Sequence, residues 1–167
     1  MRRAIALLFA LCLFAVPAFA ADAPASVAGS LAWQDGKETG RTWKADFDLN
    51  FPIASHLSIG PLLRAQYYSS EYGVDPDGGS ATLWSVGGSL TVYTTESHNG
   101  FSFGAAATAP MGEFGSGYLL EPFVQLELGG DAAFFRARYS HPLQMSEDHD
   151  TIDLERNEVT AGFGLRF

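Results

Sequence analysis

Apolar and polar residues alternate at every second position along most of the chain. In the stretch 43–51, the odd positions from Trp43 to Phe51 are apolar, and the even positions from Lys44 to Asn50 are charged or amide. Successive side chains of a β-strand point to opposite faces, so this stretch predicts a strand with one apolar and one polar face. Seven other stretches have the same rhythm, and their apolar sets are Val27, Leu31, Trp33; Leu57, Ile59, Leu63, Tyr67; Trp84, Val86, Leu90, Val92; Phe101, Phe103, Ala105, Ala107; Leu120, Val124, Leu126, Leu128; Ala133, Phe135, Ala137, Tyr139; and Val159, Ala161, Phe163, Leu165, Phe167.

Segments rich in Gly, Asp, Asn and Ser separate these stretches, as connections between strands do. They cover residues 35–41, 52–56, 73–80, 95–100, 112–117, 129–132 and 144–157. Nothing after residue 21 has convincing helical periodicity. The pattern predicts an all-β domain, an eight-stranded antiparallel up-and-down barrel. Pro61 and Pro122 fall inside predicted strands, where a missing N–H interrupts the ladder, so we expect a bulge at each.

The polar faces of the predicted strands carry five cations and five anions, whereas the apolar sets contain no charge. The ten residues are Lys44, Arg64, Arg136, Arg138 and Arg166 with Asp46, Asp48, Glu121, Glu127 and Glu158. A narrow closed lumen requires such charges to be paired, because unpaired buried ions are costly. A soluble barrel would instead place the apolar faces inside, around a ligand. Alternation alone leaves both orientations open.

The aromatic residues favour a membrane barrel. In an up-and-down topology, one end of the barrel receives Trp33, Trp43, Tyr67, Trp84 and Tyr139, and the other receives Phe51, Phe101 and Phe167. Amphipathic rings are most stable at the headgroup level, so two aromatic belts around an aliphatic band are typical of a barrel that crosses a bilayer.

The first residues have the features of a secretory signal peptide. Arg2 and Arg3 precede an apolar run from Ala4 to Val16 that is too short to cross a bilayer as a helix, and the small-residue pattern 18–20 follows. We predict a cleaved signal peptide over 1–21, cut after Ala20 or Ala21, and an outer-membrane β-barrel domain over 22–167. Cys12, the one cysteine of the chain, lies within the segment to be removed.

The formal charge of −9 excludes a nucleic-acid partner, which requires clustered Lys and Arg. Acidic residues are concentrated around His149 in the stretch 146–155, and carboxylate oxygens suit hard cations. The spacing matches no EF-hand loop, however, and most acidic runs are solvated surface. We therefore predict no metal site and no cofactor, and leave cation binding by this stretch open.

The final stretch, Val159 to Phe167, alternates apolar residues and finishes on an aromatic residue. With eight short strands after a signal peptide, the chain resembles the small eight-stranded outer-membrane barrels of the OmpA-domain, OmpX and NspA type. The resemblance implies a monomer in the outer membrane of a Gram-negative cell envelope, surrounded by outer-membrane lipid and lipopolysaccharide. It also implies insertion by the outer-membrane assembly machinery through a signal that ends at Phe167. The expected role is non-enzymatic, in envelope structure or surface interaction.

Two alternatives stay open. Some barrels of this size are lipid A deacylases with a lipid-facing His and Ser two residues apart, but beside His141 the serine is Ser140, on the opposite face. His56 and Ser58 have the spacing but lie at the periplasmic end. A triad needs its members within hydrogen-bond reach, so we assign no catalytic residue. The other alternative is the soluble periplasmic barrel that binds an apolar ligand.

Overall fold

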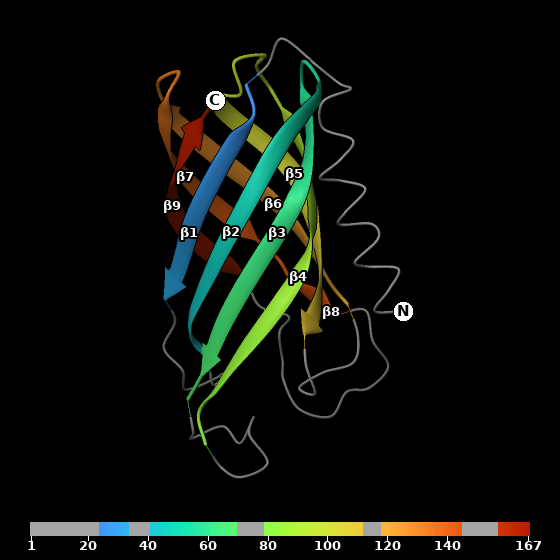
Figure 1. The fold of residues 1–167 in the computed structure, drawn as a ribbon, viewed down its shortest axis with the longest axis vertical. Helices are drawn as coiled ribbons and strands as arrows, with labels where there is room; N and C mark the ends of the chain where they lie inside the picture. Colours follow the sequence, from blue (N-terminus) through green and yellow to red (C-terminus); the bar gives the residue numbers. More distant parts are fainter. Residues whose placement is uncertain (1–23, 34–40, 70–78, 112–117, 145–156) are drawn as a thin grey trace.

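The protein is a closed antiparallel β-barrel (Figure 1). The computed structural model describes residues 24–33, 41–69, 79–111, 118–144 and 157–167. Its strands are β1 (Ser26–Trp33), β2 (Arg41–Ala54), β3 (Leu57–Tyr68), β4 (Ala81–Tyr93), β5 (Gly100–Met111), β6 (Leu119–Gly129), β7 (Ala133–Ser140), β8 (Leu143–Gln144) and β9 (Glu158–Arg166). Consecutive strands from β1 to β7 pair with each other, and β9 joins β7 to β1, so the sheet closes on itself.

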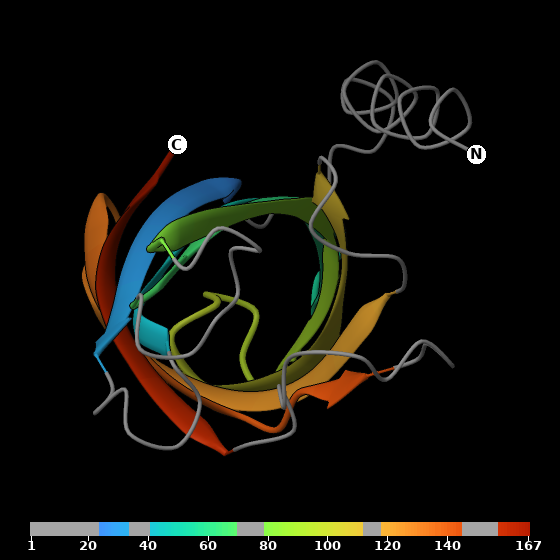
Figure 2. The same cartoon turned by 90° about the horizontal axis from the view of Figure 1, so that it is seen from below.

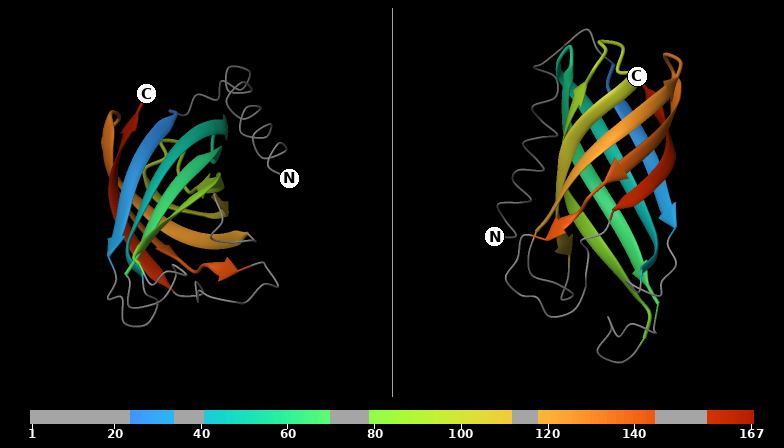
Figure 3. Two further views of the ribbon diagram at one scale, coloured as in Figure 1. Left: turned by 60° about the horizontal axis from the view of Figure 1, so that its bottom comes forward. Right: turned by 180° about the vertical axis from the view of Figure 1, so that it is seen from behind.

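The nine strands occupy eight positions in the wall, because β7 and β8 are two pieces of one position. Both pair with β6 in the same register: Ser140 lies opposite Phe123 and Leu143 lies opposite Leu120. The pieces follow one another along β6 in Figure 3. Pro142 lies at the break, where it has no N–H to donate to a ladder. The predicted eight-stranded barrel is confirmed.

The predicted bulge at Pro122 is wrong. Pro122 lies opposite Ala105 in an uninterrupted β5–β6 register, and its carbonyl accepts a 3.1 Å hydrogen bond from the His141 N–H. The N–H and C=O of one strand residue point the same way. The donor that Pro122 lacks would therefore face the break between β7 and β8, where the ladder is already interrupted.

The predicted bulge at Pro61 is also wrong. Pro61 lies opposite Gly88 in a continuous β3–β4 register, and the β2–β3 register is unchanged on either side of it. Near Pro61, the β2–β3 ladder has a gap without paired residues, between the pairs Asp48–Leu62 and Phe51–Ile59. The register shifts of the β2–β3 pair lie elsewhere, at 41–43 and 52–54.

The two ends of the barrel differ. At one end, which we call the turn end, the chain reverses through the short segments 55–56, 94–99 and 130–132, and the chain terminus lies beside them (Figure 1). The predicted turn 52–56 is thus shorter than expected, because β2 continues to Ala54. The opposite end, where β1 finishes at Trp33, we call the far end.

Seen from the far end, the strands form a ring, and the 94–99 turn lies across the bore (Figure 2). In the described part of the chain, no helix is long and apolar enough to cross a membrane. The predicted signal peptide over 1–21 lies outside the described residues.

Candidate functional site

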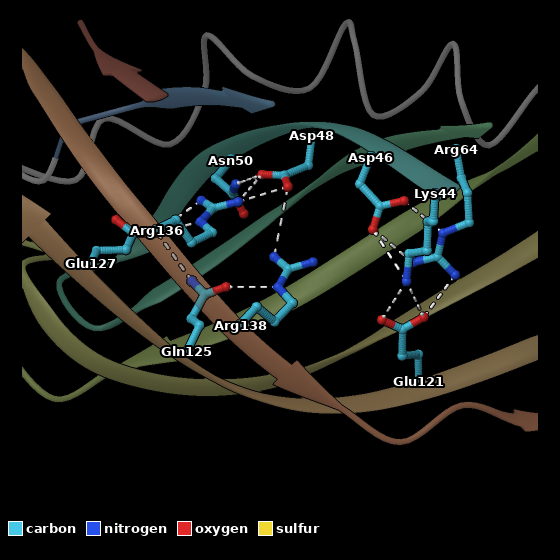
Figure 4. Close-up of polar contacts among 10 residues, drawn as sticks. All are labelled: Lys44, Asp46, Asp48, Asn50, Arg64, Glu121, Gln125, Glu127, Arg136 and Arg138. Atoms are coloured by element: carbon cyan, nitrogen blue, oxygen red, sulfur yellow. Dashed lines mark hydrogen bonds and ion pairs between the residues drawn. The ribbon is translucent and has the colours of Figure 1, made fainter. Parts of the chain in front are cut away.

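The polar face of every strand points into the barrel. All ten predicted lumen charges are buried, and the most accessible of them, Arg166, is 8% exposed. Their side chains form two clusters at different depths in the lumen, and Figure 4 draws all of them except Glu158, which pairs with Lys44, and Arg166, which pairs with Glu127. The far cluster consists of Lys44, Asp46, Arg64, Glu121 and Glu158, and the turn cluster consists of Asp48, Glu127, Arg136, Arg138 and Arg166.

In the far cluster, Arg64 holds Asp46 in a two-pronged contact, with Nε to Oδ1 at 2.7 Å and Nη2 to Oδ2 at 2.9 Å. Its Nη1 also lies 2.7 Å from Glu121 Oε2. Lys44 Nζ donates to both oxygens of Glu121, at 3.2 and 3.3 Å, and pairs with Glu158. Since β2, β3, β6 and β9 each contribute a member, these contacts join opposite sides of the wall.

In the turn cluster, Arg136 is the central residue. Its Nη1 donates to both Asp48 oxygens, at 2.8 and 2.7 Å, and its Nε and Nη2 donate to Glu127 Oε1 at 3.0 and 2.8 Å. Arg166 Nη2 donates to the second Glu127 oxygen at 3.0 Å. Arg138 donates from Nε to Gln125 Oε1 at 2.9 Å and lies 3.6 Å from Asp48 Oδ2.

Two buried aromatic rings support these arginines. The Arg138 guanidinium lies 4.2 Å from the centre of the Phe123 ring, and that of Arg166 lies 4.4 Å from the Phe134 ring. Arg136 lies 5.3 Å from the same Phe134 ring. A guanidinium over an aromatic face is attracted by the ring quadrupole, an interaction that strengthens away from water. Neither ring was predicted to face the lumen, although their positions share the inward parity of Glu121 and Arg136.

The predicted pairing of the lumen charges is confirmed, and it defines what this interior can do. Buried ions are tolerated where partners and hydrogen bonds compensate the loss of water. An eight-stranded barrel has an interior just wide enough to be filled by side chains. The two clusters therefore act as internal cross-links that fix the barrel, and the lumen is a packed polar core.

The outer surface of the wall is apolar. Large apolar side chains point outward from every strand of the barrel wall, and several are more exposed than buried, among them Leu31, Phe47, Phe103, Val124, Leu128, Val159, Phe163 and Leu165. Monomeric soluble proteins rarely expose a continuous apolar surface of this extent. This distribution is the reverse of the one expected for a soluble barrel with an apolar ligand inside, because the charged side chains face the lumen. The orientation is that of a barrel whose wall faces lipid.

The two predicted aromatic belts are present. Trp33, which is 81% exposed, pairs with Trp43 at the far end, and the Trp43 and Tyr67 rings stack at 5.9 Å. Trp84 and Tyr139 also lie toward this end, on β4 and β7. At the turn end, Phe101 is 61% and Phe167 is 70% exposed, and Phe51 lies near the end of β2. Rings at both rims of an aliphatic band suit the two interfaces of a bilayer.

The histidines considered for catalysis are not assembled with a serine. His141 is exposed and its Nδ1 lies 2.8 Å from Asn157 Oδ1, while Ser140 is buried in the lumen. His56 lies in the 55–56 turn with its Nδ1 donating to the Tyr93 carbonyl at 3.1 Å, and Ser58 is buried. No hydrogen bond between a histidine ring and a serine hydroxyl occurs among the residues that the structure describes.

The described residues also contain no group of three or more His, Cys, Asp or Glu side chains that could hold a metal ion. The acidic stretch 146–155 lies entirely in the range 145–156, outside the described residues, so cation binding there stays untested.

The comparisons with known proteins add one likeness. No protein-family model matches the chain, and no curated protein matches it. Among solved structures, the chain is similar to the Yersinia pestis outer membrane protein Ail in a phospholipid bilayer nanodisc, with 14% sequence identity and a TM-score of 0.49 over 86% of this chain and 99% of that chain. The fold of the present protein, a small eight-stranded antiparallel barrel with an apolar outer wall and a polar filled interior, rests on its own strand pairing and burial.

Proposed function

We propose that the protein is a non-enzymatic integral protein of the Gram-negative outer membrane, exported by a signal peptide, that anchors short acidic surface loops. The observation that carries this proposal is the inverted distribution of side chains: ten charges are buried inside and the apolar sets face outward. In water, the exposed apolar wall is unfavourable. In a bilayer, the apolar wall contacts lipid and the charges stay paired inside the lumen. The closed sheet needs no second copy to complete it, which supports a monomer.

The far end is proposed to face the cell exterior. The chain segments that connect strands at this end contain two basic residues, Lys37 and Arg156, and eleven acidic ones, which are Asp35, Glu38, Glu71, Asp75, Asp77, Glu113, Glu147, Asp148, Asp150, Asp153 and Glu155. Such a surface repels the phosphates of lipopolysaccharide unless divalent cations bridge them. The expected role is envelope stabilisation or surface interaction through these loops.

Surface labelling tests both the location and the orientation. In a Cys12→Ser background, Ser146→Cys, in the acidic stretch, is expected to react with a membrane-impermeant maleimide on intact cells. The matched variant Ser97→Cys, in the 94–99 turn, is expected to react only after the outer membrane is permeabilised. The labelled band should lie in the membrane fraction and change its gel mobility on boiling, because a closed barrel resists detergent until it is heated.

Release of the unlabelled protein with the soluble periplasmic contents, without a mobility change on boiling, would contradict the membrane location. Labelling of Ser97→Cys but not Ser146→Cys on intact cells would reverse the orientation.

A second prediction concerns the last strand. Phe167 is exposed at the turn end, and its N–H donates to the Ala25 carbonyl at 2.9 Å. If its ring is recognised by the assembly machinery, Phe167→Ala lowers the yield of heat-modifiable barrel in cells several-fold and leaves refolding of the purified protein into detergent unchanged. Phe101→Ala removes another exposed ring at the same end and serves as the control. An equal loss of yield in both variants would indicate a general effect of the aromatic belt.

A further inference from the structure

The 94–99 turn between β4 and β5 lies across the turn-end mouth of the barrel (Figure 2). Its residues from Thr94 to Ser97 are exposed, but His98 is buried, with 3% of its surface accessible. His98 has a positive φ of 54°, in the left-handed region that few non-glycine residues adopt. The turn therefore folds inward at His98. The burial of the His98 ring holds the backbone of this residue in an uncommon conformation.

The His98 ring is bound on two sides. It stacks on the Tyr93 ring, with 3.8 Å between the ring centres and 4° between the ring planes. Its Nε2 lies 3.2 Å from the Ser55 carbonyl, an acceptor, so Nε2 carries a proton and donates. The Arg166 Nη2 donates to the His98 carbonyl at 2.8 Å. These contacts attach the turn to β4, to the 55–56 turn and to β9.

Two further hydrogen bonds attach the 94–99 turn and Arg166 to the start of the 130–132 turn. Asn99 Nδ2 donates to the Gly129 carbonyl at 3.1 Å, and Arg166 Nη1 donates to the Gly130 carbonyl at 2.6 Å. All three reversals at this end are therefore joined through the 94–99 turn or through Arg166, and the bore is crossed at its mouth. Ser102, the cross-strand neighbour of Tyr93, is buried behind the turn.

The charged and titratable groups around His98 do not favour a second proton on its ring. Arg166 approaches from β9 and His56 lies in the neighbouring turn, while Tyr93 packs against the ring from β4. The carboxylates of the surroundings are engaged elsewhere: Glu127 pairs with Arg166, and the exposed Glu96 lies 3.9 Å from His56. Protonation would place an imidazolium in a buried position beside a guanidinium.

We propose that the 94–99 turn is an acid-released plug: neutral His98 holds it in the turn-end mouth, and protonation of His98 frees it and exposes the polar side chains behind it, such as Ser102, to small solutes. The mouth would face the periplasm in the orientation proposed above. Burial, followed by the charges of Arg166 and His56, lowers the pKa of His98 below its ordinary value of 6.5, against the opposite effect of the Ser55 carbonyl. A base with a lowered pKa stabilises the closed form fully above pH 6.5, and this stabilisation is lost as the pH falls below it.

A buried thiol reports the opening. In the full chain carrying Cys12→Ser and folded in detergent micelles, Ser102→Cys is a reporter behind the plug, and Ser97→Cys is an exposed reference in the same turn. The rate of alkylation by iodoacetamide is measured for each, and their ratio removes the intrinsic pH dependence of thiol reactivity. We expect this ratio to be constant above about pH 6.5 and to rise several-fold as the pH falls to about 5, because the lowered pKa of His98 favours the closed form less as the pH falls.

Two substitutions identify the group responsible. His98→Asn keeps a residue type that tolerates the left-handed conformation but removes the titration, so the ratio should no longer depend on pH. His56→Gln, in the neighbouring turn, should retain the step. A ratio independent of pH in the parent, or an equal step in His98→Asn, overturns the proposal. Gel mobility before and after boiling verifies that each variant is folded at both pH values.

Discussion

Arg136→Met is expected to lower the free energy of unfolding by about 3–5 kcal/mol, the cost of leaving buried charges without their partner. Arg136 donates four hydrogen bonds, two to Asp48 and two to Glu127, and all three residues are about 1% exposed or less. Without the guanidinium, two carboxylates in a closed lumen lose their main partner. Urea titration of the protein folded into phospholipid vesicles, followed by the heat-modifiable band, measures the loss.

Arg138→Met is the matched control, because Arg138 lies two residues along the same strand and faces the same lumen. It makes one hydrogen bond, to Gln125, and a looser contact with Asp48 at 3.6 Å, so its loss is expected to cost clearly less. Adding Asp48→Asn to Arg136→Met should recover part of the stability, because it removes the carboxylate that has lost its close partner, whereas Glu127 still accepts a hydrogen bond from Arg166. An equal loss of unfolding free energy in Arg136→Met and Arg138→Met would show that the change in side-chain volume, and not the loss of ion pairing, decides the effect.

The sequence predicted the wall of the barrel well, because a strand's period of two fixes the face of every residue. A slip of one residue would move a whole apolar set to the other face. For this reason all ten lumen charges and both aromatic belts lie where the alternation placed them. The partners of the charges were not predictable: Lys44 meets Glu121 across the lumen, and which residues of distant strands share a depth depends on the stagger of the closed sheet.

The prolines and the 94–99 turn show a second limit. A bulge was expected at Pro61 and at Pro122 because proline has no N–H to donate. In the structure, pairing is interrupted with only one of the two neighbouring strands, and the register of the strands continues unchanged. The sequence places His98 in a connection between two strands. Turns have no regular alternation of residues from which the burial of a side chain could be predicted. Only the three-dimensional closeness of Ser55, Tyr93 and Arg166 gives that histidine an environment.

The apolar outer wall offers the sharpest test of the proposed membrane location, at Gly29. This residue points outward from β1, and a side chain built there would meet no atom within 4 Å. Gly29 pairs with Phe47 on one side and Phe163 on the other. It lies midway along the strand between Trp33, in the far belt, and Ala25, which pairs with the end residue of the turn-end belt. The position therefore corresponds to the middle of the apolar band.

Gly29→Arg is expected to lower the free energy of unfolding in vesicles by about 2–4 kcal/mol, the cost of a basic side chain at the midplane of a barrel. Gly29→Leu occupies the same open space without charge and relieves the entropic cost of a strand glycine, so it should be at least as stable as the parent. The two variants differ in charge at one unobstructed site, which separates the effect of lipid from that of packing. If both variants keep the parental stability in vesicles, Gly29 does not contact lipid, and the proposed membrane location is contradicted.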